Sequence, residues 1–436
     1  MLKRRQRVYY GMGRFGSQVL LSFIDLAAFW IYIDRFGLNP IFSAIGFSLG
    51  KLIIAISGPL IGYFSDITWT NRWGRRKIFF IFGAPSLAIS CALAFVPNWF
   101  ISPGNQLGLL IYMIGAMAIF NFFYALLMTP YQAWMPEITE PEERVAVSTY
   151  QNGFWLMGQI VGTIGGFALP MLLSIGQELV FIMISWLGVI AVFCFVPVFI
   201  SLKEKKQAFV PQPGLRMGFQ HIFSNQNYRF YLVLQCAMGI PTTMLGRLVL
   251  FYAEDVLGLI DLQFIIIGLI LMFATFAFYF VWMWMSKRKG GKRAPLLMSL
   301  TVLTIILPFT LIIGQPILAT IPSIVQGTLF IGLIAAGVSG WYLLPNPITA
   351  DIIDEDESRT SEGRAGGYEG FINFPINIVQ IMGTMLVGFL LILPIVPPNT
   401  YSLGLLIWGP IAALFVAISI ALVWKLVDTD PLQATK

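Results

Sequence analysis

Long apolar segments recur from one end of the chain to the other, and they constrain the fold more than any other feature. Of the 436 residues, 57% are hydrophobic and only 11% are charged, against roughly 25% charged residues in an average soluble domain. A helix needs about 20 apolar residues to cross the hydrocarbon core of a bilayer. The composition therefore predicts an all-α integral membrane protein and argues against a nucleic-acid-binding domain.

Twelve segments satisfy this length requirement. The basic N-terminus is followed by a long apolar segment without a small-residue cleavage site, so we expect it to remain as the first span. The longest polar interruption separates six spans from six, which predicts an N-terminal bundle (1–202), a cytoplasmic central loop (203–227) and a C-terminal bundle with a short tail (228–436). The predicted spans cover residues 8–37, 39–66, 77–97, 105–135, 146–174, 178–202, 228–257, 262–286, 295–315, 319–350, 369–395 and 401–426.

Lysine and arginine lie almost entirely on one side of this arrangement. With the N-terminus inside, all of the 27 basic residues except Arg14, Arg35, Lys51 and Arg247 lie in tails or in loops of the same side. Positive charge marks the cytoplasmic side of membrane proteins. The distribution therefore predicts a multi-pass protein of the cell (inner) membrane with both termini cytoplasmic.

The two halves also show weak internal similarity. The segment after the second span, "SDITWTNRWGRRK", parallels "MSKRKGGKRA" after the eighth, and the segments that follow the fourth and tenth spans are similar to each other. Repeated bundles are typical of secondary transporters, because two similar units can rock about a site between them.

Three segments resemble a known family. "GYFSDITWTNRWGRRK" resembles the signature between the second and third spans of the major facilitator superfamily, in the form found in the melibiose-permease-like glycoside-pentoside-hexuronide:cation symporters. "MTPYQAWMPEIT" and "ADIIDEDESRTSEGRAGGYEG" resemble the two other cytoplasmic signatures of these symporters. The resemblance covers roughly residues 8–425. It implies twelve helices, alternating access and cotransport of a sugar-like solute with H⁺ or Na⁺.

The sequence departs from the sodium-coupled members of that family at four positions. Those members carry acids where this chain has Ile54 and Gly58 on the second span, Gln18 on the first and Met128 on the fourth. The resemblance therefore implies that the usual sodium site is absent and that the sugar pocket is different. A proton is the coupling ion that we expect.

Few ionisable residues remain deep in the apolar spans, where such groups are costly and are usually functional. Asp25 and Lys51 each lie 12 residues from the predicted outer turn between the first two spans, about 18 Å deep at 1.5 Å per residue. They can pair, either as a coupling pair that changes protonation or as a static ion pair. Arg247 either snorkels outward toward Glu254 or binds an anionic group of the substrate.

Polar and aromatic side chains from both halves form the predicted solute site. Sugar sites combine planar hydrogen-bonding groups with an aromatic face, although each residue taken singly can equally be interhelical packing. The spacing of Asn373, Asn377 and Gln380 places them along one helical face. The predicted substrate-binding residues are Gln18, Tyr124, Gln132, Trp155, Arg247, Trp341, Asn346, Asn373 and Asn377, and the wider polar set includes Gln151, Gln159, Gln235 and Gln380.

Charged residues at the inner ends of the spans predict a cytoplasmic gate. Charge-assisted pairs there would latch the gate when the transporter faces outward. The alternative is that the basic residues anchor the chain to anionic headgroups. The predicted gate residues are Asp66, Arg72, Arg75, Arg76, Asp351, Asp354 and Glu355.

The predicted function is H⁺-coupled symport of a sugar, glycoside or uronide by alternating access, by a protein that we expect to be monomeric. The chain has no GxxxxGK[ST] loop for nucleotide binding. No cofactor or metal is expected, and an enzyme is not expected. Two alternatives stay open at this point, a lipid or lysolipid permease of the same fold and a uniporter for a small organic solute.

Overall fold

The computed structural model describes residues 3–68, 70, 73–139, 141–202, 225–289, 291–345, 347–349, 351–352, 355, 365–397 and 399–425. The chain divides into two compact units, Met1–Pro211 and Gln212–Lys436. The predicted central loop 203–227 lies outside the described residues except for its last three positions. The domain boundaries proposed from the sequence therefore stay a prediction.

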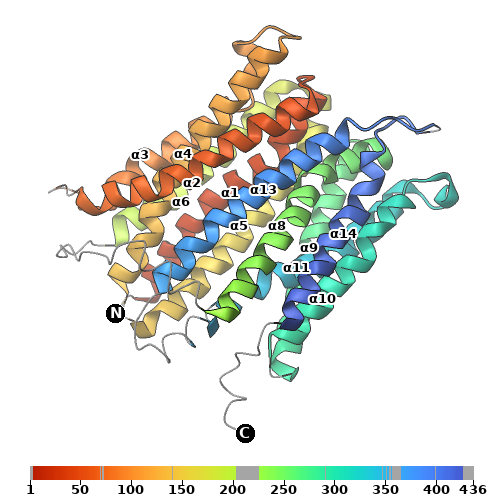
Figure 1. Ribbon diagram of the computed structural model, residues 1–436. Coiled ribbons are helices and arrows are strands. Elements are labelled where there is room, and N and C mark those ends of the chain that lie inside the picture. Colours follow the sequence, from red (N-terminus) through yellow and green to blue (C-terminus); the bar gives the residue numbers. More distant parts are fainter. Residues whose placement is uncertain are drawn as a thin grey trace. The chain divides into compact units, whose positions relative to one another are not determined.

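The described part of the first unit is a bundle of helices joined by short turns (Figure 1). A single 3₁₀ turn (Pro97–Trp99) follows the third helix. The helices are α1 (Arg4–Asp34), α2 (Pro40–Ile67), α3 (Lys77–Leu93), α4 (Gln106–Ile138), α5 (Pro141–Ile175) and α6 (Gln177–Ser201).

The second unit is also helical where it is described. Its first helix ends in one π-helical turn (Tyr252–Val256), and its third continues into a 3₁₀ turn (Leu307–Leu311). The helices are α8 (Gln226–Phe251), α9 (Leu262–Lys289), α10 (Arg293–Ile306), α11 (Ser323–Leu343), α13 (Ala365–Leu391) and α14 (Gly404–Lys425).

Each of the twelve predicted spans overlaps one of these helices. In the described part of the chain, ten helices are long and apolar enough to cross a membrane, and Lys77–Leu93 and Pro375–Leu391 are shorter apolar helices. The predicted third span extended to residue 97, but the α-helix ends at Leu93. The predicted ninth span, 295–315, is divided at the 3₁₀ turn that contains Pro308, because proline cannot donate the backbone hydrogen bond that would continue an α-helix.

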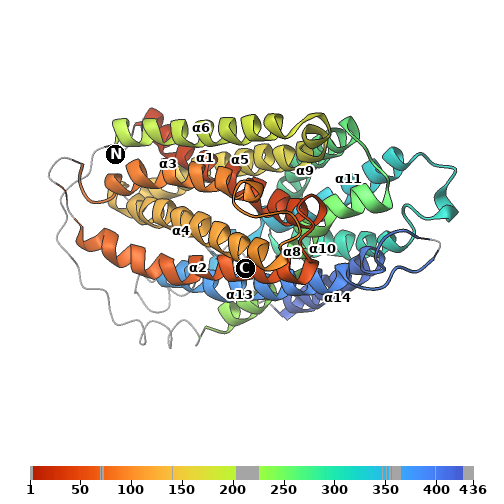
Figure 2. The same cartoon turned by 90° about the horizontal axis from the view of Figure 1, so that it is seen from above.

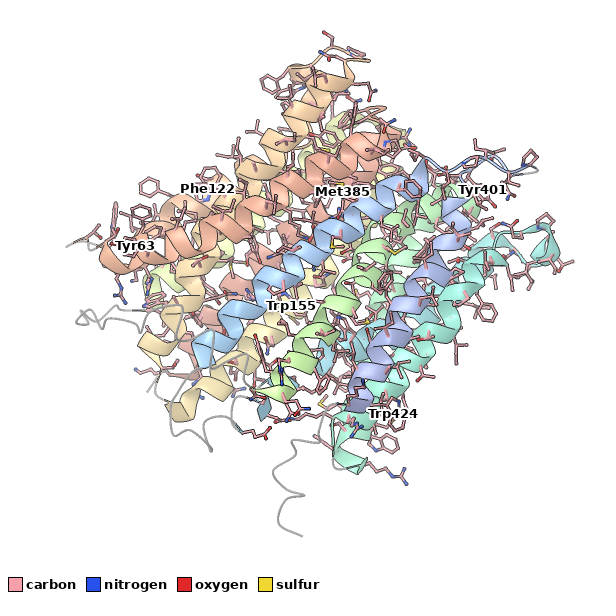
Figure 3. The ribbon with its side chains drawn as sticks, viewed as in Figure 1. Tyr63, Phe122, Trp155, Met385, Tyr401 and Trp424 are labelled. Atoms are coloured by element: carbon pink, nitrogen blue, oxygen red, sulfur yellow. The ribbon has the colours of Figure 1, made fainter. Side chains whose placement is uncertain are left out.

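Large apolar side chains cover much of the exposed surface of these helices. Ile56, Ile89, Phe193 and Leu414 are each 60% to 67% exposed. Figure 3 shows Phe122 of α4 pointing away from the first unit. Helices satisfy their own backbone hydrogen bonds, so a surface of this kind is stable in a bilayer and unfavourable in water. The surface agrees with the predicted multi-pass membrane protein.

Glycines bring α1 and α5 of the first unit into close contact (Figure 2). Gly158, Gly162 and Gly166 recur every four residues and therefore lie on one face of α5. A Cβ atom on Gly158 would lie 2.6 Å from the Phe15 carbonyl oxygen, and one on Gly162 would lie 2.3 Å from the Val19 oxygen. The two backbones can approach this closely only because those positions lack side chains.

Side-chain hydrogen bonds join three helix ends of the first unit at the turn between α1 and α2. The Asn39 backbone N–H donates to Gln106 Oε1 at 2.9 Å, and Gln106 Nε2 donates to the Gly37 carbonyl at 2.7 Å. Asn39 also caps α2 by accepting from the Ile41 N–H. These bonds hold the turn between α1 and α2 against the start of α4.

Small residues and a buried tryptophan connect helices of the second unit in the same way. A Cβ atom on Gly337 of α11 would lie 2.7 Å from Leu303 Cβ of α10. On the α9 side, Trp282 Nε1 donates to the Ala336 carbonyl at 2.9 Å and to Ser339 Oγ at 3.0 Å. A buried indole N–H is satisfied in this way, so α11 is fixed between α9 and α10.

We expect Gly162→Ala to destabilise the first unit, because its new methyl group would overlap the Val19 carbonyl of α1. Overpacking of this kind costs about 1–3 kcal/mol. Gly153→Ala is the matched control on the same helix, since a Cβ atom there meets nothing within 4 Å. Thermal unfolding of the detergent-purified variants measures the difference. Equal midpoints for the two variants would contradict the close contact.

Candidate functional site

One face of α1 carries a stripe of polar and accessible positions. Arg14, Gln18, Leu21 and Asp25 follow the spacing i, i+4, i+7 and i+11, which places them on one side of the helix. Between residues 16 and 32 every side chain of α1 is buried except those of Leu21 and Asp25. Arg14, Leu21 and Asp25 are therefore partly exposed on this side of α1, and Gln18 between them is buried.

A neutral hydrogen-bond network lies beside this stripe, between α1 and α5. Gln18 Nε2 donates to Gln159 Oε1 at 2.5 Å and to Ser22 Oγ at 3.1 Å. The Ser22 hydroxyl lies 2.6 Å from the Gln18 carbonyl and 3.1 Å from Gln159 Oε1. The close contact at Gly158 and Gly162 brings Gln159 within reach of α1. Two amide side chains are thus held in fixed orientations between α1 and α5.

The structure brings Asp25 and Lys51 together, as the sequence predicts. Lys51 Nζ of α2 lies 3.5 Å from Asp25 Oδ1 of α1. The Lys51 side chain is 11% exposed and the Asp25 side chain is 37% exposed. The carboxylate is thus accessible in the middle of a helix whose adjacent residues, Ile24 and Leu26, are buried. Whether the pair is static or changes protonation stays a hypothesis.

Other predicted residues of the first unit lie on α4 and α5. Tyr124 is within electrostatic reach of both Arg14 and Asp25. Trp155, labelled in Figure 3, lies on α5 with intermediate exposure. Gln132 is exposed on α4, and Gln151 hydrogen-bonds the side chain of Tyr131. The described contacts therefore group Tyr124 with the α1 stripe, and they do not join Gln132 to it.

Arg247 in the second unit is buried between α8 and α13. Its side chain is 3% exposed, and its Nε donates to Thr384 Oγ1 at 3.0 Å. Thr384 in turn donates to the Gln380 carbonyl at 2.8 Å. Both roles proposed for Arg247, pairing with Glu254 and binding a substrate anion, stay hypotheses.

The remaining predicted residues of the second unit are partly described. Gln235 Nε2 donates to Tyr231 Oη at 2.5 Å, and Thr349 donates to the same oxygen at 2.7 Å. Trp341 is buried, and Asn377 has intermediate exposure. Asn346 and the side chain of Asn373 lie outside the described residues.

Most of the predicted gate residues that are described have partners in their own unit. Arg76 is buried, and its Nη1 donates to Ser65 Oγ at the end of α2. Lys292 Nζ lies 2.6 Å from both Asp351 oxygens, and Asn227 Nδ2 donates to Glu355 Oε2 at 2.9 Å. Arg75 has intermediate exposure. The side chains of Asp66, Arg72 and Asp354 lie outside the described residues.

Several of these partners were not predicted from the sequence. Ser22, Ser65 and Thr384 are short hydroxyl residues inside apolar runs, and no pattern distinguishes them from packing residues. The similarity between the two basic loops could have pointed to Lys292, which lies in the second of them. Among the described residues, no three His, Cys, Asp or Glu side chains are grouped as a metal would require.

Comparisons with known proteins agree with the resemblance seen in the sequence. The sequence profile of the MFS/sugar transport protein family matches residues 9–394. The chain is 25% identical to the inner membrane symporter YicJ of Escherichia coli K12 over 269 residues, which cover 59% of this chain and 56% of that protein. It is 25% identical over 276 residues to the putative glycoside/cation symporter YagG of the same organism, covering 61% of this chain and 58% of YagG. The match thus spans little more than half the length of these relatives.

A solved structure shows the same fold. It is a bacterial homologue of the human lysosomal transporter Spinster, with a TM-score of 0.71 and 12% identity, and the match covers 98% of both chains. This likeness confirms the predicted fold, twelve transmembrane helices in two six-helix bundles. The family match is to transport proteins and not to an enzyme family. The chain belongs to the MFS/sugar transport family of the major facilitator superfamily.

Proposed function

We propose that the protein is a secondary active transporter that moves a sugar, glycoside or uronide together with a proton by alternating access. The observation that carries the proposal is the accessible carboxylate of Asp25 in the middle of α1, 3.5 Å from the ammonium of Lys51. The names of the relatives YicJ and YagG support cation symport in general.

The Asp25–Lys51 pair has the properties that proton coupling requires. The neighbouring ammonium favours the ionised carboxylate, whereas loss of that charge in a poorly solvated site favours the neutral acid. A conformational change that separates the two groups would therefore drive proton uptake, and their return would drive release. A static ion pair would serve only packing, and the 37% exposure of the Asp25 side chain supports the coupling role instead.

Sodium coupling is less compatible with the residues present. Na⁺ prefers several oxygen ligands, including carboxylates. The resemblance implies that sodium-coupled members carry acids where this chain has Ile54 and Gly58 on α2, and a sugar-binding acid where it has Met128 on α4. Met128 is buried. Asp25 is then the carboxylate on the described spans of the first unit best placed to carry the coupling ion.

Polar groups near the Asp25 face of α1 suit a hydroxylated solute. Gln159 keeps its Nε2 donor and Gln18 its Oε1 acceptor after the hydrogen bond between the two amides, and a sugar hydroxyl can bond to either kind of group. Tyr124 and Trp155 supply aromatic faces in the same unit, as sugar sites commonly do. This combination supports a sugar-like solute over the lipid permease considered from the sequence.

We expect Asp25→Asn to abolish proton-driven accumulation of solute while leaving solute exchange, because the amide cannot carry the proton. Lys51→Ala should impair both activities, because it leaves the Asp25 charge without its neighbour. Uptake by proteoliposomes, measured for a panel of sugars, glycosides, uronides and lysolipids with and without a pH gradient, tests both variants. Gln315→Ala at the outer end of the second unit is a control that should behave as wild type.

Two outcomes would redirect the proposal. Accumulation by Asp25→Asn on a pH gradient would make Asp25 structural. The carrier would then be a uniporter or would couple through another group. Stimulation of wild-type uptake by Na⁺ would contradict proton coupling. Uptake of lysolipids and of none of the sugars would contradict a sugar-like solute and support the lipid permease instead.

We also propose that both termini and the central loop are cytoplasmic, in line with the positions of lysine and arginine. A cysteine placed in the 203–227 loop should react with an impermeant maleimide only from the inside. Cysteines at Ser102 or Asn399 should react only from the outside. The measurement is labelling of intact cells against inverted vesicles, in a background without the three native cysteines. Outside labelling of the central loop would contradict the orientation.

For the cytoplasmic gate, we expect the double change Arg75→Ala and Arg76→Ala to slow turnover while changing solute affinity by only a few-fold. Loss of about 1.4 kcal/mol of latch energy would shift the ratio of states tenfold. Ser65→Ala is the matched control, because it removes the described partner of Arg76 without removing charge. Equal slowing by Ser65→Ala would assign the effect to local packing, and unchanged transport by the double variant would favour headgroup anchoring.

A further inference from the structure

Two arginines of the second unit lie over tryptophan rings, at the end of the unit where α9 and α14 finish and α10 begins. The Arg288 guanidinium carbon is 5.1 Å from the centre of the Trp284 ring, one turn earlier on α9. The guanidinium carbon of Arg293, the first residue of α10, is 5.8 Å from the centre of the Trp424 ring of α14. Arg293 Nη2 also donates to the Trp424 carbonyl. Attraction between cation and ring therefore holds both arginines against aromatic faces.

Both tryptophan rings lie on the surface of the unit. Trp284 is 56% exposed and Trp424, which Figure 3 shows at the end of α14, is 65% exposed. Tryptophan is enriched where acyl chains meet lipid headgroups, because its ring is apolar and its N–H group is polar. The exposed rings therefore place Arg288 and Arg293 at the level of the headgroups.

An apolar ladder leads along α9 to the first arginine–tryptophan pair. Phe276, Phe280, Trp284 and Arg288 recur every four residues and share one face of the helix. Phe276 is 49% and Phe280 is 54% exposed, and the centres of the two rings are 5.0 Å apart. The 12 residues from Phe276 to Arg288 span about 18 Å. One leaflet of a bilayer has a hydrocarbon depth of about 15 Å, so this ladder has the length of an acyl chain in one leaflet.

The last helix repeats this arrangement beside the second pair. Leu414 is 67% exposed and Ile418 is 51% exposed. Both share a face of α14 with the exposed Lys425, and Trp424 lies next to it. A second ladder of apolar side chains thus ends at an aromatic ring and a cation.

Positive charge is concentrated at the same end of the unit. Residues 287–293 contain five lysines and arginines. Lys292 lies 2.6 Å from both oxygens of Asp351, and Lys287 and Arg288 are exposed. Clustered cations beside a lipid-facing surface attract anionic headgroups. A guanidinium that lies over a ring also keeps N–H groups at its edge, in the geometry that matches a phosphate.

We propose that each arginine–tryptophan pair binds the phosphate of an anionic phospholipid, whose acyl chains lie along the apolar ladder of the same helix. The exposed ladders favour a lipid over a soluble anion, because a free phosphate makes no use of them. The surrounding cations favour an anionic headgroup, because a choline group would bring another positive charge next to them. This inference goes beyond the proposed transport function and does not depend on the solute.

Two lipids with the same acyl chains test the proposal. Dioleoyl phosphatidylglycerol and dioleoyl phosphatidylcholine are titrated into the full chain in detergent, and native mass spectrometry counts the bound lipids. Wild type should bind phosphatidylglycerol about fivefold more tightly than phosphatidylcholine, because the site is cationic. Arg288→Gln and Arg293→Gln should each lose one bound phosphatidylglycerol relative to wild type, and the double variant should lose two.

A second double variant separates the built site from general surface charge. Trp284→Leu with Trp424→Leu keeps every cation and an apolar surface but removes the rings that hold the guanidinium groups. It should weaken phosphatidylglycerol binding about threefold or more. Both tryptophans are exposed, so these changes leave the interior of the unit intact, and gel filtration with thermal unfolding checks that each variant is folded.

Arg35→Gln is the matched control. Arg35 also lies over a tryptophan, with its guanidinium carbon 5.6 Å from the centre of the Trp30 ring. Trp30 is fully buried and Arg35 pairs with Asp34 at 3.0 Å, so this pair presents no lipid-facing ring. The control should bind as many phosphatidylglycerol molecules as wild type.

Three outcomes would overturn the proposal. The first is an equal number of bound phosphatidylglycerol molecules in wild type and in the arginine double variant. The second is unchanged affinity in the tryptophan double variant, which would assign the binding to surface charge alone. The third is displacement of the lipid by millimolar glycerol 3-phosphate, which would identify a site for soluble phosphates. Solute uptake is not measured in any of these experiments, so their failure would leave the proposed transport function intact.

Discussion

The close contact between α1 and α5 is the constraint on which the candidate site depends. Glycines at residues 158 and 162 let the two backbones meet, and hydrogen-bonded amides lock the same interface. Helices in a bilayer gain little from the hydrophobic effect, so such contact relies on shape and hydrogen bonds. Because the other sides of α1 are covered between residues 16 and 32, Leu21 and Asp25 are the side chains of that stretch that stay partly exposed.

The buried side and the partly exposed side of α1 carry different kinds of residue. The buried side of α1 carries glycine, aromatic and aliphatic residues that pack, whereas the charged residues lie on the accessible side. Lys51 reaches Asp25 from α2, and α2 is itself held on α4 by close packing at Gly50. Small movements of α2 relative to α1 would therefore act directly on the ion pair, while the α1–α5 contact stays rigid.

The sequence predicted the helices well because the signal is simple. A span requires a long apolar run, and such runs can be read directly from the sequence. The positions of lysine and arginine predict which loops lie on the same side. It also predicted the Asp25–Lys51 pair, since two residues equally distant from one turn must lie at similar depth. It failed at partners such as Ser65 for Arg76 and Thr384 for Arg247, because a serine or threonine in an apolar run carries no periodic signal. The spacing of Arg14 and Asp25 places them on one face of the helix, but their partial exposure depends on which helices pack against α1, and the sequence does not contain that information.

The proposed coupling at Asp25 has an electrical consequence. A neutral solute that crosses with one proton on Asp25 moves one positive charge, and that charge exchanges about 2.3 kcal/mol with the membrane for every 100 mV. A monoanionic solute that crosses with one proton moves no net charge and therefore responds to the pH gradient alone. The charge of the solute thus decides which part of the proton gradient drives its uptake.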